Sequence, residues 1–339
     1  MVLLRRAIGF TSLLVVISSA VNGQLKWQPV DTSFGKLPSS VKVYKTTDPL
    51  GGKPNIAYYV IADLNDESLY FETDTALNRR LTPLEFYTKG YDPYEIKDEP
   101  HIFPIVVVNT TFFSFATNQN LNTVVSNGKL VGYNIHSLPA RGKDTLTYRH
   151  TLAGAIGISK KRKPDVAWLF TDSSGKNPFA LQQPLPVYRD SSDKLSLRDV
   201  KKKLRKEGAG QRLQKWKMQV ALGGGPVLLQ EGQIKITNDE EYRFPGKAID
   251  DRHPRTAMGY TGDNKLIILV VEGRNTGIAE GASLNHLAQI MKDLGCIEAL
   301  NLDGGGSSCM LINGKTTIRP SDREARQRPV PGVFTIKKK

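Results

Sequence analysis

The sequence has 339 residues, of which 39% are hydrophobic, 19 are proline and only 2 are cysteine. This length and composition suit one globular, loop-rich protein and exclude a small disulfide-stapled scaffold and a low-complexity chain. The formal net charge of +14 fits contact with anionic polymers or membrane surfaces. Much of the excess is local, so we do not interpret it as nucleic-acid binding.

The N-terminus has the pattern of a secretory signal. Two arginines precede a short apolar run at residues 7–17, and small residues follow up to Gly23. That run is too short to cross a bilayer, and no later stretch is long and apolar enough. We therefore expect a signal peptide at residues 1–23 and a secreted or periplasmic protein with one domain over residues 24–339.

The two cysteines, Cys296 and Cys309, follow a predicted helix and a glycine loop. Export permits a disulfide, and contact between the two is conceivable. A chain of this length does not need such a staple, so we expect two buried free thiols. No Cys/His cluster has the spacing of a zinc site.

Alternating and β-branched segments predict many strands. In chain order they are residues 41–44, 55–63, 68–73, 105–108, 151–159, 166–171, 219–222, 227–229, 265–271, 298–302 and 332–336. Hairpins are expected around Asn127-Gly128 and Glu231-Gly232. Helices are expected at 81–87 and at 284–294, where Ser283 is the N-cap and Gly295 ends the helix.

These elements predict an α+β fold, with mixed, strand-rich sheets and a few helices in a single domain. The helix at 284–294 lies between two apolar strands, which is the pattern of one βαβ crossover. Such a crossover implies local parallel pairing.

Residues 190–217 differ from the rest of the chain, because ten Lys and Arg residues face four Asp and Glu residues there. The segment predicts a basic helix, a break near Gly208, and a second short piece. A charged, solvent-facing insertion is the simpler interpretation. The alternative is a patch that holds an anionic polymer near the site.

The most unusual stretch runs from Asn301 to Met310, where one carboxylate is followed by three glycines and two hydroxyls. Consecutive glycines allow the backbone to approach a ligand, and their N–H groups can bind an anion. A tight turn is the alternative. The candidate residues here are Asp303, Gly304, Gly305, Gly306, Ser307 and Ser308.

Other apolar strands also end or begin at polar residues and glycines. These are Asn109, the loop with Gly224 and Gly225, the segment Asp250–Gly259 with His253, Arg255 and Thr256, and the segment Glu272-Gly273-Arg274. If the ends converge, two carboxylates, two or more arginines and a cluster of N–H groups meet. Paired carboxylates suit glycosyl transfer to water, and arginine forks suit phosphate. Each arginine alone is equally compatible with a structural ion pair, and His253 alone is a weak signal.

Several motifs occur in the order found in the phosphodiester glycosidases, which this chain resembles. They are Asn109 with its aromatic neighbours, Gly224-Gly-Pro226, His253-Pro-Arg-Thr-Ala257, Glu272-Gly-Arg274 and Asn301-Leu-Asp-Gly-Gly-Gly-Ser-Ser308. The resemblance implies an exported hydrolase that cleaves the sugar C1–O–phosphate bond of a glycosyl phosphodiester, for example of GlcNAc. The sequence departs from the family at Glu272, where Asp is usual, at His286, where an acid is common, and in the insertion 190–217.

The resemblance also implies roles for the residues. Asp303 faces the anomeric carbon as base or nucleophile, and Glu272 is the second carboxylate. Arg255 and Arg274, with the glycine-loop N–H groups, hold the phosphate, and Asn109 orients a sugar hydroxyl or N-acetyl group. No cofactor is implied, and a divalent cation near Asp303 is left open.

Two other functions fit the same residues. The first is a glycosidase acting on a non-phosphorylated acidic polysaccharide. The second is a non-catalytic binder of anionic envelope glycan that uses the basic segment 190–217.

Overall fold

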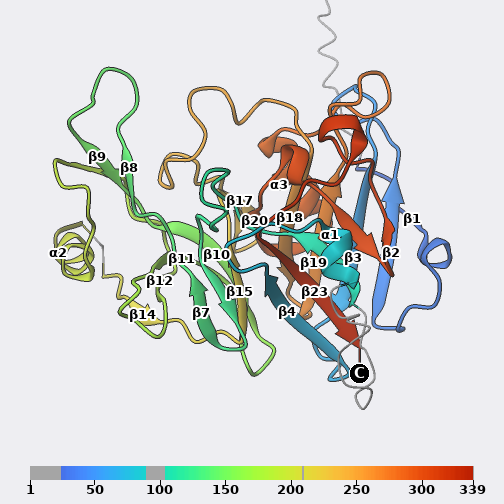
Figure 1. Ribbon diagram of the computed structural model, residues 1–339, viewed down its shortest axis with the longest axis horizontal. Helices are drawn as coiled ribbons and strands as arrows, with labels where there is room; N and C mark the ends of the chain where they lie inside the picture. The colour runs from blue at the N-terminus through green and yellow to red at the C-terminus, as the bar shows by residue number, and fades with distance from the viewer. Residues whose placement is uncertain (1–23, 89–103, 208–209, 339) are drawn as a thin grey trace, which may run out of the picture.

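The computed structural model describes residues 24–88, 104–207 and 210–338 (Figure 1). Over these residues the chain forms four β-sheets and three α-helices. All strand pairings between the described residues are antiparallel. The predicted signal peptide at 1–23 lies outside the described residues.

The largest sheet in the described part of the chain has eight strands. Their spatial order is β1 (Gln28–Pro29), β2 (Val41–Thr46), β3 (Ala57–Asp63), β19 (Lys265–Val271), β18 (Arg255–Thr261), β20 (Cys296–Asn301), β16 (Val227–Gln230) and β17 (Gln233–Ile234). Strands β18 and β19 are buried along almost their whole length, which explains their continuous apolar sequences.

The other three sheets extend the molecule on either side. A seven-stranded sheet has the order β14 (Gln214–Lys215), β12 (Phe179–Leu181), β11 (Pro164–Phe170), β10 (Ala153–Ile158), β15 (Val220–Gly223), β6 (Val124–Ser126) and β7 (Lys129–Gly132). A five-stranded sheet has the order β22 (Lys315–Thr316), β21 (Met310–Ile312), β5 (Pro104–Asn109), β23 (Gly332–Lys338) and β4 (Leu69–Thr75). The smallest sheet is β13 (Tyr188–Asp190), β9 (Tyr148–His150) and β8 (Ser137–Pro139).

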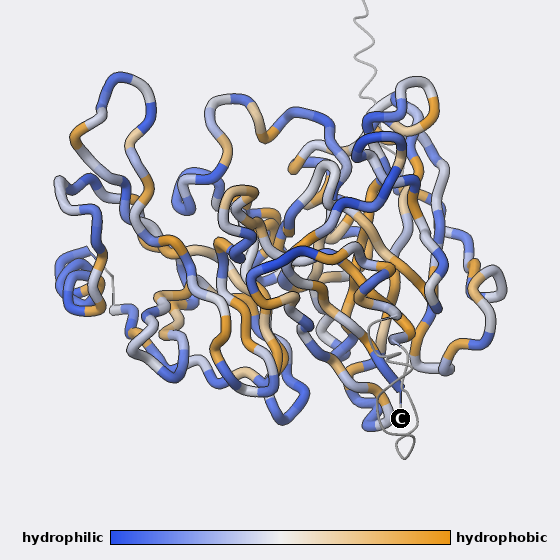
Figure 2. Tube along the Cα trace, in the orientation of Figure 1, coloured by the Kyte–Doolittle hydropathy of each residue, from blue (hydrophilic) through white to orange (hydrophobic). Residues whose placement is uncertain are grey.

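The helices lie at the outside of these sheets. They are α1 (Pro83–Thr88), α2 (Leu197–Glu207) and α3 (Leu284–Asp293), with short 3₁₀ turns η1 (Asp31–Phe34), η2 (Gly305–Ser307) and η3 (Arg323–Ala325). Helix α2 confirms the basic helix predicted in the segment 190–217, and it buries Val200 and Leu204 against the main core. One face of this insertion is therefore packed, while its charged face is exposed (Figure 2).

Helix α3 begins as the sequence predicted. The Ser283 side chain accepts a hydrogen bond from the His286 N–H at 3.2 Å, and the Ser283 N–H donates to His286 Nδ1 at 3.3 Å. His286 thus performs the second half of a capping box, a role usually filled by Glu or Gln. This gives a structural role to the histidine at a position where the family often has an acid.

The expected crossover is present, but its strands do not pair. Strands β19 and β20 flank β18, and each is antiparallel to β18, so they run in the same direction without touching. Helix α3 links them across the strand between them and packs on that face of the sheet (Figure 1). The prediction of local parallel pairing was wrong, because the strand that precedes β19 in the chain fills the gap.

The main core joins three of the sheets. Its buried side chains include Val43 of the eight-stranded sheet, Trp168 of the seven-stranded sheet and Phe334 of the five-stranded sheet. The apolar residues accordingly concentrate on the central strands (Figure 2). The two cysteines are buried and free, as expected.

Candidate active site

The polar ends of the strands converge because of the sheet register. Arg255, the first residue of β18, pairs with Val271, the last residue of β19. Two residues further along β18, Ala257 pairs with Asn301, the last residue of β20. Antiparallel pairing therefore places Arg255 at the same end of the sheet as the residues that follow Val271 and Asn301. The convergence predicted from sequence is confirmed for these three segments.

Asn109 links this end of the eight-stranded sheet to the five-stranded sheet. Its Nδ2 donates to the Asp303 carbonyl oxygen at 2.7 Å, and its Oδ1 accepts from Thr256 Oγ1 at 2.9 Å and from the Cys309 N–H at 3.1 Å. The Asp303 N–H in turn donates to the Thr110 carbonyl at 2.9 Å. The Asn109 side chain is fully buried. The expectation that Asn109 contacts a sugar directly does not fit this burial; its amide instead fixes the backbone around Asp303.

Thr256 and Ser308 belong to the same buried network. Thr256 Oγ1 lies 3.2 Å from Ser308 Oγ, and both residues are at most 1% exposed. They were expected to bind substrate. The structure places them behind the site instead, where they support Asn109.

Asp303 follows β20 and is partly buried. Burial raises the pKa of the Asp303 carboxyl from 3.8 to about 6, while the Ser307 side chain, the Arg328 charge and the Gly304 N–H act against that rise. A carboxyl with this pKa is mostly ionised at neutral pH and gains a proton in mild acid. Those properties suit a catalytic base or nucleophile.

Arg328 is a neighbour of Asp303 that sequence reasoning did not select. Its guanidinium forms two hydrogen bonds with Asp322, at 3.0 and 3.1 Å, and reaches Ser307 Oγ at 3.4 Å. A Cβ added at Gly306 would overlap this guanidinium, so a side chain there would displace Arg328. In the sequence, Arg326 and Arg328 are simply two charged residues near the C-terminus. They form no motif with the other site residues, so nothing pointed to the site.

Arg255 and Arg274 add two more guanidinium groups. Arg255 is buried and donates to the carbonyl oxygens of Ala282 and Asp251, at 3.0 and 2.9 Å. Burial lowers the pKa of Arg255 from 12.5 to about 10; the Asp251 charge acts against this fall and the Arg274 charge adds to it. Arg274 is exposed and lies over Gly305. Neither arginine has a carboxylate within ion-pair distance among the described residues. Arg274 is exposed and therefore open to an anionic ligand, whereas Arg255 is only 4% exposed.

His253 lies next to these arginines. Its Nδ1 is buried and has no hydrogen-bond partner among the described residues. Burial and the charges of Arg255 and Arg274 lower the pKa of His253, so its imidazole is neutral at pH 7. The Gly305 N–H donates to the carbonyl of Pro254 at 2.8 Å, which places this segment against the glycine loop. His253 is therefore a stronger candidate for a substrate-binding residue than the sequence alone suggested.

Glu272 has a different position from the one expected of a second catalytic carboxylate. Its oxygens accept hydrogen bonds from Asn275 Nδ2 at 3.1 Å and from the Arg319 N–H at 2.9 Å. The side chain is 4% exposed. The carboxylate therefore ties down the loop that carries Arg274, and this positioning role replaces the one we expected.

The glycine N–H groups are largely used within the protein. The Gly304 N–H bonds the Asp303 carboxyl, and the Gly305 N–H bonds Pro254. The Gly224 and Gly225 N–H groups donate to the carbonyls of Gly154 and Asn301, at 3.0 and 2.8 Å. These four N–H groups are thus not free to hold an anion, contrary to the sequence-based expectation.

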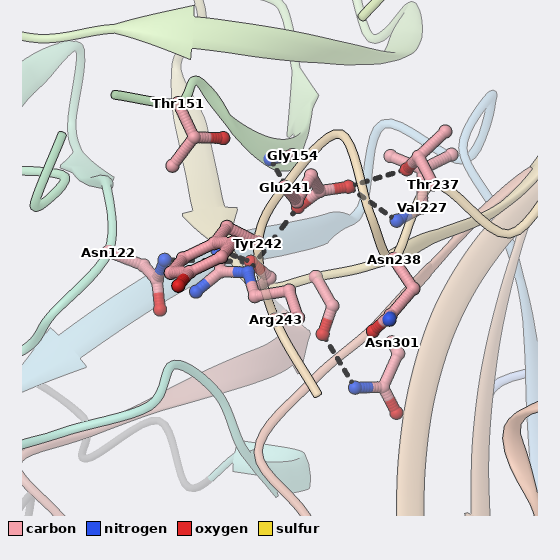
Figure 3. Close-up of polar contacts among 12 residues, drawn as sticks. Asn122, Thr151, Gly154, Val227, Thr237, Asn238, Glu241, Tyr242, Arg243 and Asn301 are labelled. Atoms are coloured by element: carbon pink, nitrogen blue, oxygen red, sulfur yellow. Dashed lines mark hydrogen bonds and ion pairs between the residues drawn. The ribbon is translucent and has the colours of Figure 1, made fainter. Parts of the chain in front are cut away.

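A buried carboxylate, Glu241, supports the loop at Gly224–Pro226 (Figure 3). It is 0% exposed and accepts hydrogen bonds from the N–H groups of Gly154 and Val227, at 3.0 and 2.8 Å, and from Thr237 Oγ1 at 2.7 Å. Arg243 Nε lies 3.5 Å from it and the same guanidinium donates to the Gly224 carbonyl. Sequence reasoning missed this pair, because no strand end or glycine marks it.

The described residues contain no helix long and apolar enough to cross a bilayer. Within the same residues, no three His, Cys, Asp or Glu side chains are grouped as a metal site requires.

Comparison with known proteins supports the family resemblance. Over 109 residues the chain is 35% identical to the bovine N-acetylglucosamine-1-phosphodiester alpha-N-acetylglucosaminidase. The aligned stretch covers 30% of this chain and 20% of that protein. Over 85 residues it is 38% identical to the SPbeta prophage-derived protein YomE of Bacillus subtilis, covering 25% and 13% of the two chains. The chain thus spans far less than two thirds of the length of these relatives.

The fold is similar to that of the zebrafish N-acetylglucosamine-1-phosphodiester alpha-N-acetylglucosaminidase catalytic domain, solved in a form auto-inhibited by its pro-peptide. The TM-score is 0.55 at 19% identity, over 94% of this chain and 89% of that one. A Synechocystis protein of similar fold gives 0.56 at 15% identity, over 93% and 68%. The sequence pattern of the phosphodiester glycosidases matches residues 103–337. The chain therefore belongs to the phosphodiester glycosidase family, a family of enzymes.

Proposed function

We propose that this protein is an exported hydrolase that cleaves the C1–O bond of a glycosyl phosphodiester and releases a sugar and a phosphomonoester. The observation that carries this proposal is the charge around Asp303. One carboxyl of raised pKa lies beside Arg328, and Arg255 and Arg274 are close by and form no ion pair with any described residue. Guanidinium groups that form no ion pair within the protein favour an anionic substrate.

The reaction needs one bond broken and one formed at the anomeric carbon. The C1–O bond breaks, and its electron pair stays on the phosphate oxygen. Water then adds to C1 and loses a proton. In this scheme Asp303 acts as base or nucleophile at C1, while the guanidinium groups of Arg255 and Arg274 stabilise the charge on the departing phosphate. A phosphate ester leaves readily, so arginine clamping replaces much of the protonation that an alkyl glycoside requires.

The arginines favour a phosphodiester over a non-phosphorylated acidic polysaccharide. A tetrahedral phosphate offers oxygens in several directions, so two forks from different segments can bind it at once. Arg255 comes from the start of β18, and Arg274 comes from the loop after β19. The zebrafish and bovine relatives are named for a GlcNAc phosphodiester, so α-GlcNAc is our first choice of sugar.

The test is hydrolysis of p-nitrophenyl- or UDP-linked α-GlcNAc phosphodiesters, with plain p-nitrophenyl α-GlcNAc as the control substrate. The variants are Asp303→Asn, Arg255→Ala and Arg274→Lys. Asp263→Asn and Arg198→Lys are matched controls, since both residues lie on exposed surface elsewhere. We expect the phosphodiesters alone to be cleaved, with activity lost in Asp303→Asn, strongly reduced in both arginine variants, and kept in the controls.

Two results would contradict the proposal. Cleavage of the plain glycoside at a similar rate would indicate an ordinary glycosidase. Full activity in Asp303→Asn would remove this carboxyl from the reaction. Absence of any hydrolysis, with salt-sensitive binding of anionic glycan that depends on the α2 lysines, would instead favour a binding protein.

A further inference from the structure

A groove of about 480 Å³ lies beside the segment that carries Asn109, and the proposed reaction does not use it. Its walls come mainly from the loop at 77–78, the segment 118–121 and the segment 131–135, with Thr75 and Pro331 beside them. The volume falls within the range of about 300–1,000 Å³ that is usual for small-molecule sites.

The chemistry of this groove is uncharged. None of its lining residues is Asp, Glu, Lys, Arg or His, although the whole chain has a net charge of +14. The polar groups are the side-chain amides of Asn78, Asn118, Gln119 and Asn120. Among the described residues, the side chains of Asn78 and Gln119 have no hydrogen-bond partner, and both are exposed. Each amide can both donate and accept, as a sugar hydroxyl also can.

Apolar side chains form a strip along the same groove. Val131, Tyr133 and Ile135 alternate with the buried residues Gly132 and Asn134, so all three project to the outer side. Their exposed fractions are 48%, 38% and 45%. Polar residues are expected on the solvent side of such a segment, so an outward apolar strip with one aromatic ring points to a ligand that has apolar faces. Pyranose rings have such faces between their hydroxyl edges.

The chain segment at residues 109–121 connects the candidate active site to the groove. Thr111 Oγ1 donates to Asn120 Oδ1, and the neighbouring Thr110 carbonyl accepts from the Asp303 N–H. The same segment carries Phe115, whose ring lies 5.3 Å from the Arg328 guanidinium carbon and is 61% exposed. One short segment therefore borders both the reacting carboxyl and the uncharged groove.

We propose that this groove binds an uncharged saccharide, which is the part of the substrate beyond the sugar phosphate that reacts. The inference rests on the proposed function for the placement of that saccharide, but the binding itself does not depend on catalysis.

The test is calorimetric titration of the full chain with chitotriose, maltotriose and mannotriose, and with a hyaluronan tetrasaccharide as the acidic comparison. The variants are Tyr133→Ala, Tyr133→Phe and Gln119→Ala. Tyr148→Ala is the matched control, because Tyr148 is a partly exposed tyrosine of β9 that does not line the groove. Melting temperatures of all four variants verify that they fold. Hydrolysis of a short α-GlcNAc phosphodiester is measured in parallel.

We expect at least one uncharged trisaccharide to bind. Tyr133→Ala should weaken that binding about tenfold or more, which is about 1.4 kcal/mol, and Gln119→Ala should weaken it less. Tyr133→Phe and Tyr148→Ala should bind as the wild type does. Hydrolysis of the short substrate should be unchanged in every variant, because that substrate does not reach the groove.

The outcomes separate this inference from the proposed function. If the short phosphodiester is cleaved but no uncharged trisaccharide binds, or if Tyr133→Ala binds as well as Tyr148→Ala, the groove proposal is wrong and the proposed function stands. Tighter binding of the acidic tetrasaccharide would also overturn it. Binding that depends on Tyr133 without any hydrolysis would keep the groove and reject the proposed function.

Discussion

Asn109 Nδ2 donates a hydrogen bond to the main-chain oxygen of Asp303 at 2.7 Å, across 194 residues of sequence. This bond links the five-stranded sheet to the loop that follows β20. The carboxyl that we assign to catalysis is therefore held by a buried amide on another sheet. The predictions below test how far activity and stability depend on this support.

Replacing Asn109 by Ala should lower both activity and stability. The change leaves the Cys309 N–H and the Thr256 hydroxyl without their buried acceptor, at a cost of about 1–3 kcal/mol for each unpaired group. We expect the free energy of unfolding in urea to fall by about 2–4 kcal/mol, and kcat to fall more than KM rises. Asn65→Ala at an exposed turn is the control, and equal losses in the two variants would contradict the assigned role.

The rate should fall in mild acid. Burial raises the pKa of Asp303 from 3.8 to about 6, and the proposed reaction needs the ionised form. The profile of kcat/KM should therefore have an acid limb near pH 6. A profile that stays flat down to pH 4.5 would exclude Asp303 as the ionising group.

The same carboxyl should reduce stability at neutral pH. Its folded pKa lies above its unfolded pKa, so the folded state binds the proton more tightly between pH 3.8 and about 6, and stability declines as the pH rises through that window. Asp303→Asn should therefore be inactive yet more stable than wild type at pH 7, by about 1–3 kcal/mol. Denaturant unfolding at pH 7 and pH 4 checks this, and the gain should shrink at the lower pH. A variant that is less stable at pH 7 would contradict the prediction.

Removing the charge of Arg328 should move the acid limb to higher pH. The positive charge of Arg328 acts to lower the pKa of Asp303, so Arg328→Gln raises that pKa further. Arg326→Gln is the matched control, because the Arg326 guanidinium pairs with Glu324 in solvent. Profiles with the same acid limb in both variants would show that Arg328 does not act on Asp303 through its charge.

Gly224 should tolerate no side chain. A Cβ at this position would overlap the Asn301 carbonyl oxygen, which is backbone and has little room to move. Gly224→Ala should therefore cost about 1–3 kcal/mol in the free energy of unfolding. Gly262→Ala is the control, since an added Cβ there meets no atom within 4 Å. If Gly224→Ala leaves the free energy of unfolding unchanged, the loop at Gly224 can move away from Asn301, contrary to this prediction.

Much of the strand order along the chain was predictable, because apolar runs and turn residues are local signals. The hairpins at Asn127-Gly128 and Glu231-Gly232 follow from residues that accept positive φ, and all four have it in the structure. The pairing across β18 was not predictable, since it depends on which strand fills a gap in the sheet. No local sequence pattern indicates that β18 lies between β19 and β20.

The candidate site was predictable in part for the same reason. Asp303, Arg255 and Arg274 stand at strand ends and next to glycines, so their positions could be inferred from the sequence. Arg328 and Glu241 act through partners far along the chain or within irregular loops, and their spacing is uninformative. The roles of Asn109 and Glu272 were misjudged, because a sequence does not show whether a polar group faces the ligand or the protein behind it.

The burial of the two cysteines has a consequence for the resistance of the protein to oxidation. Burial raises the pKa of both thiols to about 12, and the Cys309 N–H is part of the network around Asn109. Oxidants and disulfides react with the thiolate, and almost none forms at neutral pH. If the protein is exported as we propose, the backbone behind its reacting carboxyl is resistant to chemical damage in an oxidising environment.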